Sequence, residues 1–182
     1  MPLTTEQKAI FKTNVESDPV LSLLAPSNAS ANIIMDAYNT VGDFIVWRSS
    51  TPIADVFEAI TWKKLTPEDA PDGTAAYTNI SLACQGRQFN IQTMLMGQPS
   101  IASNKTNIRQ GLNDALTDVP SGVGGATQAA GWVSVKTTMS RAATRAEVLF
   151  ATGTGTSASP GDLVFEGMLT QNEVTSALGG AW

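Results

Sequence analysis

Short apolar stripes with helical spacing, separated by proline and glycine, recur along this chain and constrain its fold more than any other feature. In one of them, Ile53, Val56, Phe57 and Ile60 follow the i, i+3, i+4, i+7 pattern of a buried helix face. Proline or glycine closely follows the other apolar segments, at residues 33–41, 74–96, 108–119 and 132–149, and also follows a helix predicted at residues 4–17. We therefore predict a mainly α fold, a helical bundle-like domain with a small β element and an extended loop or arm.

Capping signals mark where three predicted helices begin, one of them a further helix near the end of the chain. Thr4 with Gln7, and Thr170 with Glu173, have the spacing of a capping box, in which each side chain bonds the other residue's backbone N–H. The pair Thr51-Pro52 is typical of a cap followed by a first-turn proline. The last helix should therefore start after Thr170, near the end of the chain.

The longest predicted helix follows the glycine-rich loop at residues 121–125. Its apolar side chains alternate steps of three and four, a seam of the knobs-into-holes type: Trp132, Val135, Met139, Ala142, Ala146 and Leu149. Arg141 and Arg145 lie one turn apart beside this seam. They indicate either a solvated face or salt bridges to a neighbouring subunit.

Two short β-prone runs complete the prediction. Residues 44–47 and 163–165 are apolar and β-prone, so they are expected as short strands, and their mutual pairing is plausible. Between them lies a flexible loop, residues 152–161, rich in threonine, glycine and serine. With its C-terminal segment at 162–182, the whole chain of 182 residues, 1–182, is expected to be a single domain.

The residue inventory excludes most catalytic and metal chemistry. The chain has no histidine and one cysteine, Cys84, so it lacks a Ser-His-Asp triad, a histidine zinc site, a thiolate zinc cluster and an intrachain disulfide. Glu68, Asp69 and Asp72 keep carboxylate catalysis formally open, but their context indicates a capped turn. The glycine-rich segment 152–156 has no Walker lysine after it. We predict no enzyme activity, no cofactor and no metal.

The net charge and the low fraction of charged residues favour a protein that assembles with other chains over one that binds nucleic acid. The net charge of -5 opposes sequence-independent binding to DNA, which needs clustered lysine and arginine. Charged residues make up only 15% of the chain, below the usual share of about a quarter, so its surface can be buried without stranding many charges. We see no secretory signal at the start and no apolar run long enough for a membrane span.

Seven stretches, spread in order over most of the chain, carry a family resemblance. They are Leu3–Ala9, Ala37–Asn39, Phe44–Arg48, Cys84–Asn90, Ala143–Glu147, Leu149–Gly155 and Leu163–Gly167. Together they resemble the head–tail connector, or adaptor (neck), proteins encoded beside the major capsid gene of tailed bacteriophages. The resemblance implies a mainly helical subunit that forms a ring, expected to be a twelve-fold dodecamer, beneath the portal.

The resulting hypothesis is a virion structural protein that bridges portal and tail proteins at the head–tail junction. It would assemble in the host cytoplasm and surround the DNA channel, and the genome would pass through without specific binding. The alternatives are a tail-completion or capsid-decorating protein and, further away, a binding domain unrelated to virions. Our interface candidates are Arg141, Arg145, Thr152, Thr154, Thr156, Phe165 and Trp182.

Overall fold

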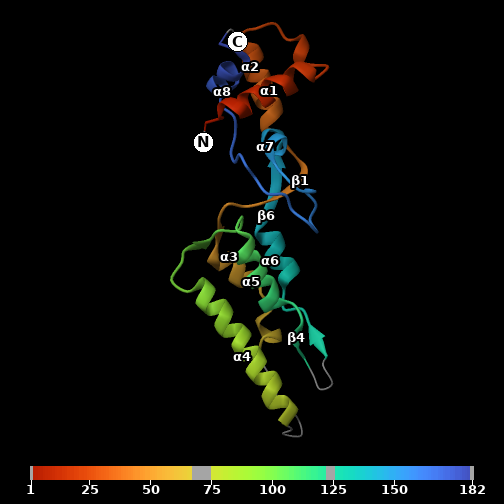
Figure 1. Ribbon diagram of the computed structural model, residues 1–182, viewed down its shortest axis with the longest axis vertical. Helices are drawn as coiled ribbons and strands as arrows, with labels where there is room; N and C mark the ends of the chain where they lie inside the picture. The colour runs from red at the N-terminus through yellow and green to blue at the C-terminus, as the bar shows by residue number, and fades with distance from the viewer. Residues whose placement is uncertain (1, 67–74, 122–125, 181–182) are drawn as a thin grey trace. The chain divides into compact units, whose positions relative to one another are not determined.

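The computed structural model describes residues 2–66, 75–121 and 126–180, and its regular structure is mainly helical (Figure 1). Within these residues the α-helices are α1 (Thr5–Ser17), α2 (Asn28–Asn39), α3 (Ile53–Ala59), α4 (Ala75–Leu95), α5 (Thr106–Leu116), α6 (Trp132–Thr138), α7 (Arg145–Phe150) and α8 (Gln171–Leu178). Two 3-10 turns are η1 (Leu21–Leu23) and η2 (Trp62–Lys64). The predicted mainly α class with small β elements is confirmed. Among the described helices, none is both long and apolar enough to cross a membrane.

Short strands form three two-stranded sheets in the described part of the chain. The strands are β1 (Val41–Trp47), β2 (Thr51–Pro52), β3 (Ser100–Ile101), β4 (Val119–Pro120), β5 (Thr127–Gln128) and β6 (Ser140–Thr144). The strand β1 pairs with β6, while β2 pairs with β3 and β4 with β5, both antiparallel. The strand predicted at residues 44–47 is therefore confirmed as part of β1.

The chain divides into two compact units. The terminal unit comprises Met1–Val46 and Ala142–Trp182, and the central unit comprises Trp47–Arg141. Each unit has a hydrophobic core made of its own residues. The single-domain organisation of residues 1–182 stays a prediction.

In the terminal unit, α8 packs against both α1 and α2. The rings of Phe11 and Tyr38 meet at a centroid distance of 4.7 Å in its core. Both predicted capping boxes are present, with Thr4 before α1 and Thr170 before α8. Local side-chain bonds therefore start these helices where the sequence predicted.

In the central unit, α4 packs on α5 and β4, and α3 packs on α6. The apolar stripe of α3 is confirmed, because Ile53, Val56 and Ile60 are buried. The predicted cap at Thr51 is wrong: this residue belongs to β2, and its hydroxyl shares a 2.6 Å hydrogen bond with the Ser103 hydroxyl. Pairing with β3 has taken the place of capping.

The longest predicted helix is wrong, because residues 132–149 divide into α6, β6 and the start of α7. A third capping box breaks this stretch: the Thr144 hydroxyl accepts from the Glu147 backbone N–H, and the Glu147 carboxylate accepts from the Thr144 N–H. Residues ahead of this cap are extended and pair with β1. The alternating apolar pattern thus belongs to three elements, and Arg141 and Arg145 are not neighbours on one helix.

The second predicted strand, at residues 163–165, is also wrong. The partner of β1 is β6. Residues of the loop at 152–161 form further hydrogen bonds with the backbone of β1. The Ile45 N–H donates to the Gly155 carbonyl at 2.7 Å, and the Gly161 N–H donates to the Ile45 carbonyl at 2.8 Å. Covering strand groups in this way limits pairing with other chains.

Candidate functional site

Arg145 forms its contacts within the terminal unit. Its guanidinium lies 2.7 Å from the Asp18 carboxylate and 4.4 Å from the centre of the Tyr38 ring. This ion pair lies within the chain, so it matches neither interpretation made from the sequence, a solvated face or a bridge to another subunit. Arg141, in β6, belongs to the central unit. Their roles at an interface stay predictions.

The three threonine candidates lie together in a hydrogen-bonded loop, and all three are exposed. The Thr154 hydroxyl donates to the Ser159 carbonyl at 3.0 Å, and the Ser159 N–H donates to the Thr156 hydroxyl at 3.0 Å. Thr152 exchanges backbone hydrogen bonds with Asp162 at the base of the loop. Two of the threonine hydroxyls therefore already serve the loop itself.

The two aromatic candidates have different outcomes. Phe165 is only 4% exposed, and its ring meets the Phe150 ring edge-on at 5.8 Å. It therefore stabilises the core of the terminal unit, and its ring is not available to another chain. Trp182 lies outside the described residues, as do Glu68, Asp69 and Asp72.

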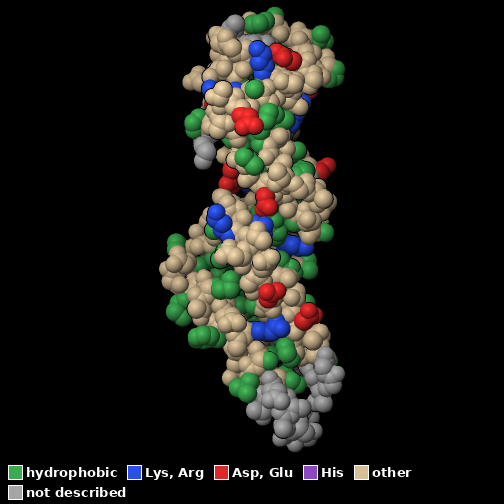
Figure 2. Space-filling view, in the orientation of Figure 1, with side chains coloured by type: hydrophobic (Ala, Val, Ile, Leu, Met, Phe, Trp, Pro, Cys, Tyr) green, Lys and Arg blue, Asp and Glu red, His purple; other side chains and the backbone are tan. Residues whose placement is uncertain are grey.

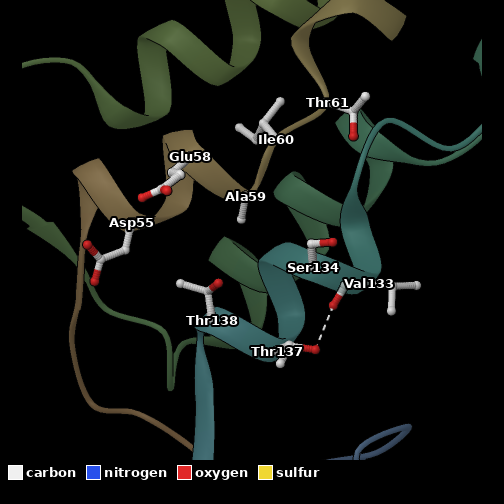
Figure 3. Close-up of a pocket in the computed structure, with 9 residues that line it drawn as sticks. All are labelled: Asp55, Glu58, Ala59, Ile60, Thr61, Val133, Ser134, Thr137 and Thr138. Atoms are coloured by element: carbon white, nitrogen blue, oxygen red, sulfur yellow. Dashed lines mark hydrogen bonds between the residues drawn. The ribbon is translucent and has the colours of Figure 1, made fainter.

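An open cleft lies between α3 and α6 in the central unit (Figure 3). The carboxylates of Asp55 and Glu58 come from α3, and hydroxyl groups come from α6 and its end. The Thr137 hydroxyl donates to the Val133 carbonyl of its own helix at 3.0 Å. Within the described ranges, no group of three or more carboxylate or thiol side chains could hold a metal ion. The cleft offers carboxylate and hydroxyl groups for polar contacts.

The outward face of α4 is the most distinctive surface of the central unit. Leu82, Phe89 and Met96 recur at intervals of seven residues and are 60%, 68% and 73% exposed. The opposite face is also apolar, with Cys84 and Ile91 buried in the core. A helix that is apolar on both sides is typical of one buried on both sides.

No charged side chain lies on this outward face between Ile80 and Met96. The one ionisable group in that span besides buried Cys84 is Arg87, whose guanidinium donates to the carbonyls of Asp114, Thr117 at 2.6 Å and Asp118 at 3.1 Å. Arg87 thus serves the C-terminal end of α5, where unpaired carbonyls favour a cation. Figure 2 shows hydrophobic side chains in green along the region of α4, separated by tan atoms, which are other side chains or backbone.

No protein-family model, curated protein or solved structure matches this chain. The interpretation of the outward face of α4 therefore depends on the residues of this helix alone. The seven-residue spacing of Leu82, Phe89 and Met96 places these exposed apolar side chains on one side of the helix, and contiguous exposed apolar side chains are typical of interaction surfaces. The face is suited to burial against another helix.

Proposed function

We propose that this chain is a virion structural protein, an adaptor subunit that assembles with copies of itself into a ring at the head–tail junction of a tailed bacteriophage. In this proposal the ring contacts portal and tail proteins, encloses the DNA channel and catalyses no reaction. Bundle-like packing of α1, α2 and α8 in the terminal unit and of α4 with α5 in the central unit would provide rigid building blocks.

The observation that carries the proposal is the uncharged, apolar outward face of α4. Burying a large apolar side chain stabilises by roughly 1.5–3 kcal/mol. Leu82, Phe89 and Met96 are 60%, 68% and 73% exposed, so burying their exposed fractions contributes about 3–6 kcal/mol, at the low end of the association cost of about 4–15 kcal/mol. One such contact between two subunits would therefore be weak. In a closed ring every subunit makes the contact with both of its neighbours, so the free energy of association of the whole ring is larger.

Two further features support a ring around DNA. A ring closes through heterologous contacts, so each subunit needs two different faces that fit one another. The low charged fraction of 15% allows such faces to be buried at small electrostatic cost. The net charge of -5 would also repel DNA passing through the channel, provided that acidic groups face the lumen.

Assembly of the purified chain tests the first part of the proposal. Phe89→Ser should weaken self-association in sedimentation velocity experiments and leave the unfolding midpoint nearly unchanged, because Phe89 is 68% exposed. Val133→Ser is the matched control, since Val133 is also 68% exposed but lies on α6. Equal association of the two variants would contradict a role for the α4 face.

Location in the particle tests the second part. Electron microscopy of virions should find one ring of copies around the tail axis, between portal and tail. Copies spread with icosahedral stoichiometry would instead indicate a decorating protein. Fully infectious virions that lack the chain would rule out the adaptor function.

A further inference from the structure

The cleft between α3 and α6 has carboxylates on one wall and hydroxyl groups on the other (Figure 3). Asp55 and Glu58 lie one turn apart on α3, so both carboxylates stand on the same side of that helix. Both side chains are exposed, and neither has an ion pair or a hydrogen bond with the described part of the chain. Ser134 and Thr138 contribute hydroxyl groups from the other wall. Two negative charges therefore line this cleft without a cation beside them among the described residues.

Backbone contacts fix the two walls of the cleft to each other. The Thr61 N–H donates to the Ala130 carbonyl at 3.0 Å, which joins the segment after α3 to the segment before α6. A Cβ atom on Gly131 would lie 2.7 Å from the Ala59 carbonyl oxygen, so glycine is required for this close approach. The cleft has a volume of about 800 Å³, within the range of roughly 300–1,000 Å³ of clefts that receive ligands. It is therefore a built feature of the central unit with room for side chains of another chain.

Unpaired cations gather on a different surface of the same unit. Most lysine and arginine residues have a hydrogen-bond, ion-pair or other electrostatic partner: Lys8, Lys12, Arg48, Arg87, Arg109, Lys136, Arg141 and Arg145. Within the described chain, the side chains of Lys63, Lys64 and Lys105 have none. Lys63 and Lys64 are adjacent in η2, both are exposed, and neither lines the cleft. The central unit thus carries two separate surfaces of opposite charge.

We propose that the cleft between α3 and α6 receives the side chains of Lys63 and Lys64 from a second copy of the chain. Charge complementarity identifies this occupant, because two carboxylates without a cation would meet two ammonium groups without an anion. The inference rests on the proposed function, since it names a contact by which neighbouring subunits of the ring join.

This contact is heterologous, because it joins two different surfaces. A copy whose lysines enter the cleft of one neighbour keeps its own cleft open for the lysines of another neighbour. Repetition of such a contact produces a ring when its rotation closes, as the proposed function requires. Ion pairs between subunits set the choice of partner and the rate of association more than the affinity. The pairs would therefore fix which surfaces of two copies meet.

Reversing the charges of one surface at a time tests the contact in the full chain. Asp55→Lys with Glu58→Lys places cations in the cleft, and Lys63→Glu with Lys64→Glu places carboxylates on η2. Each double variant alone should self-associate at least about tenfold more weakly than the wild type in sedimentation velocity experiments, because like charges then meet. A mixture of the two double variants should associate like the wild type, since each cleft then finds lysines or carboxylates of opposite charge.

Two single variants control for the change in net charge. Asp36→Lys and Lys105→Glu each reverse an exposed charge outside both surfaces, so their association should match that of the wild type. All the changed side chains are exposed, so thermal unfolding should show nearly the same midpoint for every variant. The wild type gives an independent test that needs no substitution. Its association should weaken at least about threefold when the salt concentration rises from about 0.05 M to about 0.5 M.

The outcomes separate this contact from the proposed function. Association of the mixture that stays as weak as that of each double variant would overturn the contact, and so would wild-type association that is independent of salt. Normal association of both double variants would also overturn it and would leave a basic segment of another protein as the occupant of the cleft. In these cases the wild type still assembles, so the proposed function stands. If the wild type never associates, the proposed self-assembly fails, and this contact fails with it.

Discussion

The guanidinium of Arg145 lies 2.7 Å from the carboxylate of Asp18, although 127 positions separate the two residues in the chain. The same carboxylate accepts hydrogen bonds from the backbone N–H groups of Val20 and Leu21, at 2.9 and 3.0 Å. The arginine also lies over the Tyr38 ring of α2. One side chain at the start of α7 thereby joins α2 and the turn that follows α1.

Replacing Arg145 should destabilise the terminal unit. Arg145→Met removes the ion pair and the stacking on Tyr38, and the loss of stacking alone should cost about 0.5–1 kcal/mol at this partly exposed position. Arg145→Lys keeps the charge but loses the planar stacking group, so its urea unfolding midpoint should lie between those of the wild type and Arg145→Met. Identical midpoints for the wild type and Arg145→Met would show that the contact contributes nothing.

Stability should depend on pH through Asp18. Hydrogen bonds from the Leu21 backbone, the Arg145 side chain and the Val20 backbone lower the pKa of this carboxyl from 3.8 to about 2. Because the folded-state pKa is the lower one, the stabilisation is present above the unfolded pKa and is lost as the pH falls through the folded pKa. The difference in unfolding free energy between the wild type and Asp18→Asn should be constant above about pH 5 and shrink towards pH 2. Urea titrations across this range measure it, and a difference independent of pH would contradict the assignment.

Glu147 should be among the most sensitive positions. It is 1% exposed, and its carboxylate accepts from the N–H groups of Thr144 and Gly167, both at 2.9 Å. Glu147→Ala leaves the buried Thr144 N–H and the exposed Gly167 N–H without this acceptor, so we expect a loss of about 1–3 kcal/mol in the free energy of unfolding. Exposed Glu16→Ala, the control, should change it by less than about 0.5 kcal/mol. Faster hydrogen exchange at Gly167 would accompany the loss, and equal stability of both variants would contradict it.

Gly155→Ala should be costly for two separate reasons. Gly155 has φ +64, and an added Cβ would lie 2.2 Å from the Phe44 ring. The left-handed conformation costs about 1–2 kcal/mol and overpacking about 1–3 kcal/mol more. Gly97→Ala isolates the first effect, since Gly97 has φ +74 with open space around it. Thermal unfolding should rank wild type, Gly97→Ala and Gly155→Ala in falling order, and a smaller effect at Gly155 would show that Phe44 moves aside.

Capping boxes were the most reliable sequence signal. Those at Thr4 and Thr170 start α1 and α8 as predicted. The same spacing occurs at Thr144 and Glu147, inside the stretch that was predicted as one long helix. The apolar seam predicts one continuous helix through this stretch, whereas the capping box at Thr144 correctly predicts that a new helix begins there.

The candidate interface was harder to predict than the helices. The apolar stripe of α4 that faces α5 and the one that faces outward have similar composition, so periodicity does not show which is exposed. Phe165 illustrates the opposite error, because an aromatic side chain suited to an interface is instead packed against Phe150. Burial depends on neighbours that are distant in the sequence.

The sequence by itself determined the mainly helical class, the starts of α1 and α8, and the absence of histidine chemistry, because each depends on residue types or on bonds across three or four positions. Only the tertiary structure decided that β1 pairs with β6, that Arg145 meets Asp18, and that Leu82 and Phe89 face outward. These outcomes depend on contacts between distant segments, whose free energies compete with one another and leave no local signature in the chain.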